Sequence, residues 1–356
     1  MRLSAAALIL ASTPLAVTTA DFSAVPVVDL LEDEASTVST VLGALRKFGF
    51  FYVFNHGVDP ALIEAQFVQS RDLFALPAAM KEAMPFNGTL DIGYLGSGGQ
   101  ALDEEGGIGD TKEGFMLTNN GVFDPSFTLS ADDPLAGAEL HWPPRDVLPN
   151  YERILRAYTA ALSSLNHRLN ALLFRAVGLG ESERRALAAQ PFTVTKQMRY
   201  TPSQSQRSGE LGAGAHADWG ALTILATDGQ PGLEVEHPDG GWLPVPPRPG
   251  CLIINAGDQI THWTNGYLRS ANHRVVVSSR SRARYSTAFF TYFDLHATVS
   301  ALPQYVSDEK PPVRPPETTL EYFHFKLAES VGHKDPAAQH EHAVKEEATC
   351  TDEHVE

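Results

Sequence analysis

Three residues that are able to bind a metal ion stand out in the sequence. His216 and Asp218 lie two positions apart in a strand-like run, and residues at i and i+2 of a strand point to the same face. His273 lies further along the chain in a second strand-like run. Two histidines and one carboxylate on one side of an ion leave three coordination positions open, which is the ligand arrangement of non-haem Fe(II) oxygenases. The sequence therefore predicts that His216, Asp218 and His273 bind iron, with open positions for a co-substrate and oxygen.

The His-x-Asp pattern is weak evidence by itself, because the chain contains it at 216–218, 237–239 and 333–335. The second copy contains Pro238 and runs into two glycines, which predicts a hairpin turn. The third copy is followed by too little chain to supply a distal histidine within a sheet. A histidine taken alone is more often a structural residue than a ligand. Only the first copy is followed by a strand, a distal histidine and a cation, and this combination favours the metal site.

The cation is Arg284, which lies eleven residues after His273 on the next strand-like run, and Ser286 shares its face. A buried guanidinium beside a hydroxyl binds a carboxylate through charge-assisted hydrogen bonds. A dicarboxylate could therefore bind iron with one end and this pair with the other. The alternative is an exposed strand cation, because Arg280 and Arg282 lie close by. The position of Arg284 after the distal histidine favours an anchor for a co-substrate.

Composition restricts the class of protein that carries these residues. The chain has 356 residues, of which 43% are hydrophobic and 20% are charged, as in a globular protein. Its net charge of −16 argues against a nucleic-acid-binding protein, which needs a basic face. No apolar run reaches the roughly 18 residues of a membrane-spanning helix. Two cysteines are too few for a disulfide framework or a zinc-finger cluster.

The segments before residue 190 alternate between strand and helix patterns. Short β-branched or aromatic runs predict strands, and apolar residues at three- and four-residue steps predict helices. Strands are expected at 25–30 and 48–57, and helices are expected at 39–48, 60–76 and 148–177. Residues 87–110 are rich in Gly and Asp and have no clear period, which predicts a long loop that contributes to function.

The pattern changes between residues 193 and 293, where short β-type runs alternate with turn clusters. The separators include Pro-Gly at 231–232, Pro-Asp-Gly-Gly at 238–241 and Asn-Gly at 265–266. Runs at this spacing predict an all-β sandwich or barrel, which would bring the iron ligands together. A helical segment near 316–330 is expected to follow the β-rich part.

The two ends differ from the rest of the chain. Residues 1–20 contain one cation, an apolar stretch and then small residues, which is the order of a secretory signal peptide with cleavage before Asp21. The alternative is a disordered Ala-rich arm, and the protein is then expected in the cytoplasm. Residues 331–356 are acidic and predict a disordered tail. Between the ends we expect an N-terminal region over 21–150 and a catalytic region over 151–330.

Several motifs occur in the order that one known family shows. The segments GAGAHADWGALTILATDGQPGLEV, NAGDQITHWTNGYLRSANHRV and RYSTAFF carry the predicted iron ligands and Arg284. They resemble the 2-oxoglutarate- and Fe(II)-dependent dioxygenases of the isopenicillin N synthase-like superfamily. VPVVDL, FGFFYVFNHG and DTKEGF are similar to the N-terminal half of that family. The resemblance covers residues 25 to 330 approximately.

The resemblance implies an α+β fold, a double-stranded β-helix or jelly roll with N-terminal and flanking helices. It also implies Fe(II), 2-oxoglutarate and O2 as cofactor and co-substrates, with ascorbate as a candidate reductant. The residues that it assigns to iron are His216, Asp218 and His273. The residues that it assigns to the distal carboxylate of 2-oxoglutarate are Arg284 and Ser286.

Tyr200 lies on the strand that in many relatives directs a tyrosine toward the co-substrate. Plant relatives often have an asparagine two residues before this tyrosine, where this chain has Met198. The alternative for Tyr200 is a core aromatic residue. Halogenating relatives lack the carboxylate ligand, so the presence of Asp218 favours oxygen transfer or desaturation.

The expected function is the coupling of oxidative decarboxylation of 2-oxoglutarate to hydroxylation or desaturation of a small organic substrate. One alternative is a 2-oxoglutarate-independent oxidase of the same fold, similar to ACC oxidase or isopenicillin N synthase. Another is a metal- or ligand-binding protein without turnover. A small organic molecule is expected as the substrate rather than a protein or a nucleic acid, because of the family and the acidic charge.

Overall fold

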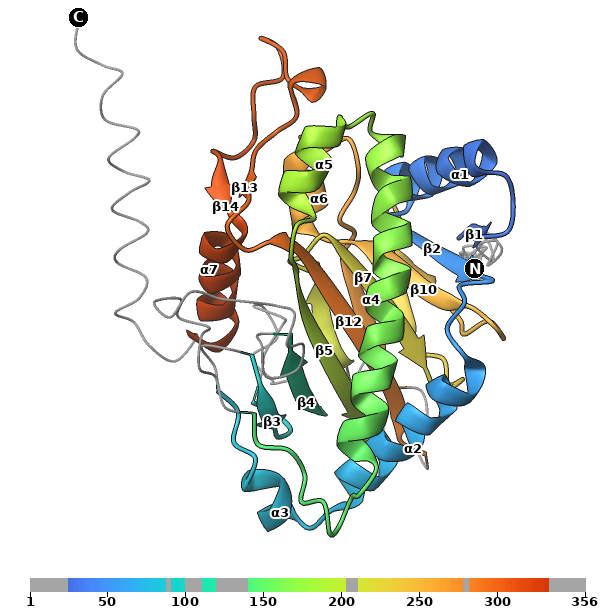
Figure 1. Ribbon diagram of the computed structural model, residues 1–356, viewed down its shortest axis with the longest axis vertical. Helices are drawn as coiled ribbons and strands as arrows, with labels where there is room; N and C mark the ends of the chain where they lie inside the picture. Colours follow the sequence, from blue (N-terminus) through green and yellow to red (C-terminus); the bar gives the residue numbers. More distant parts are fainter. Residues whose placement is uncertain are drawn as a thin grey trace, which may run out of the picture.

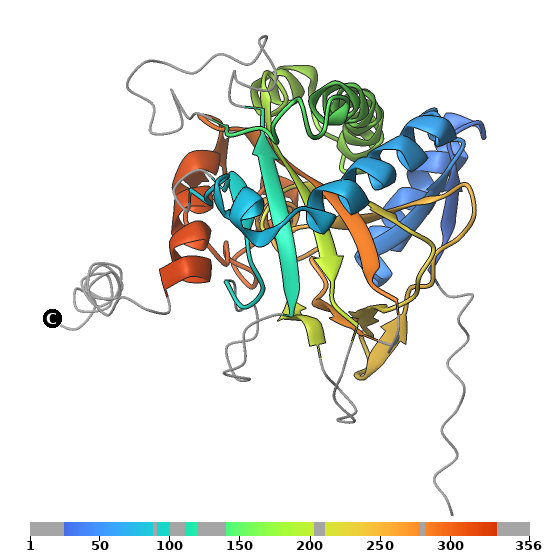
Figure 2. The ribbon, with the colours of Figure 1, turned by 90° about the horizontal axis from the view of Figure 1, so that it is seen from below.

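The computed structural model describes residues 25–87, 91–99, 111–119, 140–202, 211–277 and 282–332. The expected leader, the acidic tail and much of the expected 87–110 loop lie outside these residues. Figures 1 and 2 show the chain from two directions at right angles. Within the described ranges, no helix combines the length and the apolar character that crossing a membrane requires.

An eight-stranded sheet forms one wall of the structure (Figure 1). Its strand order is β1-β2-β10-β7-β12-β5-β4-β3. Neighbouring strands are antiparallel, apart from β1, which is parallel to β2. The bounds are β1 Val27–Asp29, β2 Phe50–Phe54, β3 Gly93–Leu95, β4 Lys112–Thr118, β5 Pro191–Tyr200, β7 Leu222–Thr227, β10 Leu252–Ala256 and β12 Arg284–Asp294.

A second sheet of four strands has the order β6-β11-β8-β9. Its bounds are β6 Leu211–His216, β8 Leu233–Glu236, β9 Trp242–Pro244 and β11 His273–Val276. A two-stranded sheet pairs β13 Thr298–Val299 with β14 Glu317–Thr318. Residues of the eight-stranded and four-stranded sheets line one shared pocket, so these two sheets enclose it. This is the arrangement that a double-stranded β-helix predicts.

Strand β12 shows how the alternation of side chains separates the pocket from the core. Arg284, Ser286 and Ala288 lie at alternate positions and line the pocket. Thr287 and Phe289 point to the opposite face, where Phe289 packs in the core beneath the helices. Both faces of this strand are buried, which explains why its sequence has no clear polar side.

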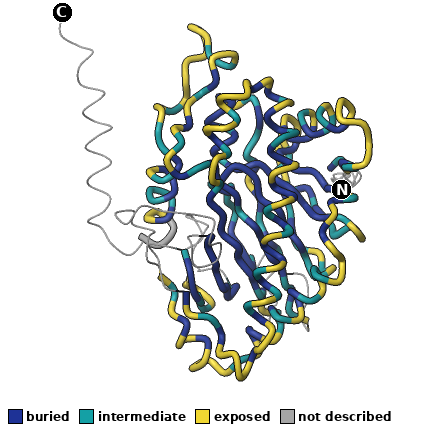
Figure 3. Tube along the Cα trace, in the orientation of Figure 1, coloured by how far each residue is buried: buried dark blue, intermediate teal, exposed yellow. Residues whose placement is uncertain are grey.

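Helices cover the outer face of the eight-stranded sheet. The bounds are α1 Glu34–Lys47, α2 Pro60–Ala75, α3 Ala78–Glu82, α4 Tyr151–Ala176, α5 Glu181–Leu187, α6 Asp258–Trp263 and α7 Thr319–Gly332, with a 3-10 turn at Pro303–Tyr305. The long helix α4 crosses the sheet and packs against both α1 and α2 (Figure 1). Its apolar residues at three- and four-residue steps are buried, among them Leu155, Leu162 and Leu169. Figure 3 shows the resulting contrast between buried strands and the partly exposed helices over them.

The predicted helices at 60–76 and 148–177 are confirmed, with small shifts at their ends. Helix α1 begins earlier than predicted, because Asp33 caps it and accepts a hydrogen bond from the backbone N–H of Ser36 at 3.0 Å. The predicted hairpin turn at 237–239 is also confirmed, since it connects the antiparallel strands β8 and β9. Several elements were not predicted, among them β3, inside the expected long loop, and α6, inside the β-rich part.

Candidate active site

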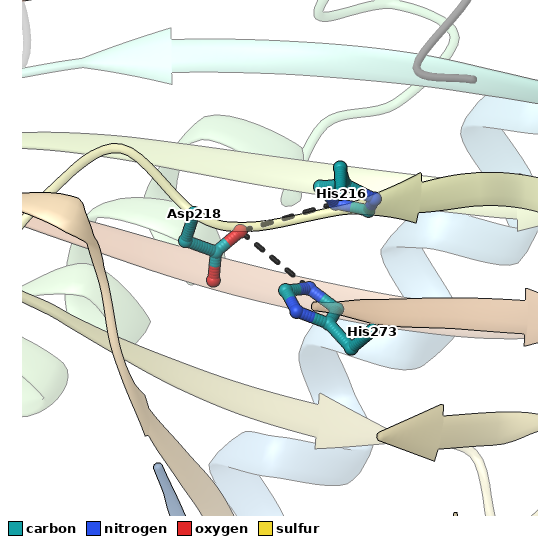
Figure 4. Close-up of side chains that lie close together, drawn as sticks. All are labelled: His216, Asp218 and His273. Carbon is teal, nitrogen blue, oxygen red and sulfur yellow. Dashed lines mark ion pairs between the residues drawn. The ribbon is translucent and has the colours of Figure 1, made fainter. Parts of the chain in front are cut away.

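The structure brings His216, Asp218 and His273 together at the pocket (Figure 4). One possible ligand atom from each residue lies within 4.8 Å of the others. The Nε2 atom of His273 is 3.6 Å from Asp218 Oδ1, and that of His216 is 4.0 Å from the same oxygen. Two imidazole nitrogens and one carboxylate oxygen therefore converge on a single point, which is a geometry that suits a metal ion.

The two histidines meet because β6 and β11 are antiparallel neighbours in which His216 and His273 lie opposite each other. The prediction that His216 and Asp218 share a strand face is wrong. Strand β6 ends at His216, and Asp218 lies in the bend that leads to β7. The carboxylate reaches the histidines because the chain turns at this point, not because the side chains alternate along a strand.

A hydrogen bond at Nδ1, the nitrogen that faces away from Asp218, orients each imidazole ring. His216 Nδ1 is 2.7 Å from the carbonyl oxygen of Gly214, and His273 Nδ1 is 3.2 Å from that of Ala271. A carbonyl can only accept, so each Nδ1 carries the proton and donates it in these hydrogen bonds. Each Nε2 then has a free lone pair that faces Asp218, which is the tautomer that a metal requires.

The carboxylate of Asp218 is also oriented, through the oxygen that faces away from the histidines. Asp218 Oδ2 accepts hydrogen bonds from Thr223 Oγ1 and from Asn255 Nδ2, each at 2.6 Å. Thr223 and Asn255 are buried partners on the neighbouring strands β7 and β10. Because Oδ2 is used in this way, Oδ1 is the oxygen presented to the histidines. Neither donor was predicted from the sequence.

We expect Thr223→Val and Asn255→Leu to weaken metal binding without removing a ligand. Loss of a hydrogen bond that orients a metal ligand typically costs about 10- to 100-fold in metal affinity. Titration of the metal-free protein with Fe(II) under anaerobic conditions measures this change. Thr291→Val is the matched control, because it also removes a buried hydroxyl, one that bonds to Leu222 and not to Asp218. Unchanged metal affinity in both test variants would show that these contacts do not orient the carboxylate.

Burial and neighbouring charges favour the protonation states that bind a metal. Burial, reinforced by the neighbouring His273, lowers the pKa of His216 well below its usual range. Burial would raise the pKa of Asp218, but the two histidines and its two hydrogen bonds together lower it. A neutral imidazole and an ionised carboxylate are therefore favoured at neutral pH, and both are ready to bind a cation.

The bend that carries Asp218 is fixed by a close approach of two backbone segments. The N–H of Asp258, at the start of α6, donates to the carbonyl oxygen of Asp218 at 2.7 Å. A Cβ atom on Gly257 would lie 2.3 Å from the carbonyl oxygen of Gly220. Any side chain at Gly257 would therefore push the bend away, which explains why glycine occupies this position.

Arg284 and Ser286 line the same pocket as the three converging residues. Both are buried, with exposed fractions of 5% and 1%. No residue that the structure describes hydrogen-bonds to Arg284 Nε, Arg284 Nη1 or Ser286 Oγ. Buried polar atoms nearly always have partners, so these atoms point to a ligand that brings oxygen acceptors into the pocket. The alternative of an exposed strand cation is wrong for Arg284.

Tyr200 is a core aromatic residue and also a pocket residue. It is 3% exposed, packs in a core cluster with Met198, and lines the pocket. The guanidinium carbon of Arg284 lies 4.9 Å from the centre of the Tyr200 ring, which is within the range of a cation–π contact. The tyrosine hydroxyl lies 3.3 Å from the sulfur of Met198. Its clearest contact with the site is therefore through Arg284.

These features suit Fe(II) and a dicarboxylate together. The metal-binding group has the two-histidine, one-carboxylate composition that leaves coordination positions open. In the same pocket, the buried donors of Arg284 and Ser286 match one carboxylate of such a ligand. The residues present therefore fit both groups.

Comparison with known proteins decides the family. Residues 193–292 match the family model of the 2OG-Fe(II) oxygenase superfamily, and residues 21–145 match the model for the N-terminal region of non-haem dioxygenases in morphine synthesis. A 2-oxoglutarate-dependent dioxygenase of Didymella fabae is 32% identical over 263 residues, which cover 71% of this chain and 78% of that protein. The chain belongs to the 2OG-Fe(II) oxygenase superfamily.

Other members of the superfamily are similar to this chain over most of its length. Flavanone 3-dioxygenase 2 of Oryza sativa subsp. japonica is 32% identical over 302 residues, with 84% of this chain and 82% of that protein covered. The crystal structure of JOX2 in complex with 2OG, Fe and JA has a TM-score of 0.69 at 30% identity, covering 85% and 84% of the two chains. The predicted double-stranded β-helix is thereby confirmed. As a superfamily member, the chain is an Fe(II)- and 2-oxoglutarate-dependent dioxygenase.

Proposed function

We propose that this oxygenase couples the oxidative decarboxylation of 2-oxoglutarate to hydroxylation or desaturation of a small organic molecule at this pocket. His216, Asp218 and His273 hold the iron, while Arg284 and Ser286 hold the distal carboxylate of 2-oxoglutarate. The observation that carries this assignment is the pair of buried residues, Arg284 and Ser286, whose donors have no partner among the described residues and which line the pocket of the metal-binding group. One site thus offers both the metal ligands and the carboxylate anchor that the reaction requires.

Bound iron supplies the oxygen activation and hydrogen abstraction that amino-acid side chains cannot perform. The protein supplies orientation. The three ligands lie on one side of the site, and the hydrogen bonds of Asp218 direct a single carboxylate oxygen toward it. The other side stays available for the keto acid and oxygen. Arg284 fixes the far end of the keto acid, so that its reacting end has one position relative to the ligands.

The walls of the pocket limit access of water. Leu225, Leu233, Val275 and Phe290 contribute apolar surface to the lining of the pocket that also contains the metal ligands and Arg284. Apolar walls strengthen the hydrogen bonds that Arg284 and Ser286 make with a carboxylate, because less water competes for them. They also protect reactive species from side reactions.

Tyr200 supports the anchor in this proposal. Its ring lies against the Arg284 guanidinium, and Arg284 and Tyr200 are paired residues of β12 and β5. A flat aromatic face on one side of a guanidinium restricts the plane in which its N–H groups point. We therefore assign Tyr200 to the orientation of Arg284.

The size of the substrate is proposed from the relatives and the pocket. The rice relative is named for a flavanone, and the JOX2 structure contains JA. A pocket enclosed by two sheets suits a molecule of small-metabolite size. We propose a small organic substrate on these grounds.

Anaerobic reconstitution tests the proposed site directly. Fe(II) is added to the metal-free protein, then 2-oxoglutarate, and the weak visible charge-transfer band of the iron–keto acid complex is recorded. We expect the band to appear with 2-oxoglutarate and to require both additions. Iron binding without a band would favour the 2-oxoglutarate-independent oxidase. Metal binding with neither a band nor oxygen uptake under a broad set of substrates would favour a binding protein.

A further inference from the structure

Helix α6 connects the proposed iron ligand Asp218 with the C-terminal part of the chain. Its first residue, Asp258, makes one hydrogen bond in each direction. The backbone N–H of Asp258 donates to the carbonyl oxygen of Asp218 at 2.7 Å, and the Asp258 carboxylate accepts from the hydroxyl of Tyr322 at 2.8 Å. Tyr322 lies on α7, and neither it nor Asp258 lines the pocket. A side chain outside the pocket is thus joined to an iron ligand through a single intervening residue.

Backbone hydrogen bonds hold the start of α6 against the bend that carries Asp218. Three successive N–H groups, those of Gly257, Asp258 and Gln259, donate to carbonyl oxygens of residues 218–221 at 2.9, 2.7 and 3.2 Å. Three adjacent bonds leave the bend little freedom to move apart from the helix. Any change in the position of α6 therefore changes the position of the Asp218 backbone.

Two further side-chain contacts join α6 to residues 317–322. Gln259 Nε2 donates to Thr319 Oγ1 at 3.1 Å, and His262 Nδ1 lies 3.4 Å from Glu317 Oε1. Strand β14 and the first turn of α7 form this segment (Figure 1). Gln259, His262 and Thr319 are buried, so little water competes for their contacts. The segment 317–322 is therefore the support on which the position of α6 depends.

We propose that Tyr322 is a positioning residue of the iron site, which acts through Asp258 on the backbone of Asp218. This inference rests on the proposed function, since it takes the three converging residues as iron ligands. The side-chain hydrogen bonds of Asp218 select the oxygen that faces the metal, whereas the contacts of α6 set where the residue itself lies. Coupling between two binding events is reciprocal. Docking of residues 317–322 on α6 thus favours iron binding, and bound iron favours the docking by the same factor.

Tyr322→Phe tests the contact because it removes the hydroxyl and keeps the ring. We expect its Fe(II) affinity, measured by anaerobic titration of the metal-free protein, to fall by about 3- to 10-fold, which is the range of one hydrogen bond. Thr319→Val removes the acceptor of Gln259 and should lower the affinity in the same direction. Tyr52→Phe is the matched control, because it removes a buried tyrosine hydroxyl that donates to the carbonyl oxygen of Pro246 at 2.6 Å. Its Fe(II) affinity should equal that of the wild type.

A double-mutant cycle separates positioning from a general loss of stability. Asp258→Ala removes the carboxylate and keeps the backbone N–H that binds Asp218. It should lower Fe(II) affinity, and Tyr322→Phe added to it should lower the affinity no further, since the hydroxyl has already lost its acceptor. Hydrogen exchange measures the reverse effect. Fe(II) should slow exchange of the Thr319 and Leu320 amides, which donate to backbone carbonyls in the docked segment, and should slow it less in Asp258→Ala.

Fe(II) affinity in Tyr322→Phe that equals that of the wild type, or a loss that Tyr52→Phe shows equally, would overturn the proposal. So would losses that add in the double variant, because the two residues would then act independently. If the proposed function itself is wrong, the wild type fails to bind Fe(II) or the protein binds it as tightly after His273→Ala. The two failures are thereby distinguished.

Discussion

Replacement of His273 by alanine is expected to abolish iron binding and all turnover. Among the residues that the structure describes, His273 provides one of the two imidazoles at the site, and its Nε2 lies 3.6 Å from the Asp218 oxygen that faces the metal position. Loss of a ligand should exceed the roughly 10- to 100-fold effect of losing a residue that merely orients a ligand. The iron content of the reconstituted variant and its succinate production measure the effect. His216→Ala should behave in the same way.

A thermal-shift measurement separates loss of the ligand from loss of the fold. A metal that binds only the native state stabilises it by about 2.7 kcal/mol when its free concentration is 100 times its Kd. Added Fe(II) or Co(II) should therefore raise the Tm of the wild type and leave that of His273→Ala unchanged. His237→Ala is the matched control, because His237 lies in a His-x-Asp sequence at the β8–β9 hairpin, away from the pocket. Normal succinate production by His273→Ala would remove this residue from the iron site.

The three converging residues could be selected from the sequence because their residue types, followed by Arg284, are rare in combination. Their assembly was only partly predictable. The contact between His216 and His273 depends on the pairing of β6 with β11, which are far apart in the chain. The position of Asp218 depends on a bend that the backbone of α6 holds by hydrogen bonds. Local patterns do not contain such long-range pairings, which is why the predicted shared strand face was wrong.

The residues that orient Asp218 were missed for a related reason. Thr223 and Asn255 are each part of a buried β-run, where a single polar residue resembles ordinary core. Their function follows from the register that places them side by side on β7 and β10. A polar residue within a fully buried strand was the available signal, because such a residue needs a partner.

Lys196 also lines the pocket, and this position was not predicted from the sequence either. It lies in the run TVTKQMRY, where polar residues occupy both faces of β5. Alternation therefore did not show which face pointed into the pocket. The buried network on the opposite face accounts for this, since Gln197 accepts a hydrogen bond from Tyr151 and donates to Gln66.

Arg284→Ala should raise the requirement for 2-oxoglutarate steeply and leave iron affinity unchanged. Arg284 is 5% exposed and its Nε and Nη1 atoms have no partner among the described residues, so a bound carboxylate would be their main acceptor. A hydrogen bond to a charged group contributes about 1.5–3 kcal/mol, which corresponds to roughly 10- to 150-fold in the half-saturating concentration. The charge-transfer band, titrated with 2-oxoglutarate, measures this concentration without turnover. The half-saturating concentration for Arg284→Lys should lie between those of the wild type and Arg284→Ala, because lysine keeps the charge but loses the planar, forked arrangement of N–H donors.

A keto acid without the distal carboxylate tests directly whether Arg284 binds that carboxylate. 2-Oxopentanoate has a methyl group in place of the distal carboxylate of 2-oxoglutarate and should bind the wild type much more weakly. In Arg284→Ala the two keto acids should bind nearly alike, because the group that distinguishes them has lost its partner. Arg282→Ala is the control, since it removes an exposed cation two residues away. If Arg284→Ala discriminates between the keto acids as well as the wild type does, the carboxylate anchor lies elsewhere.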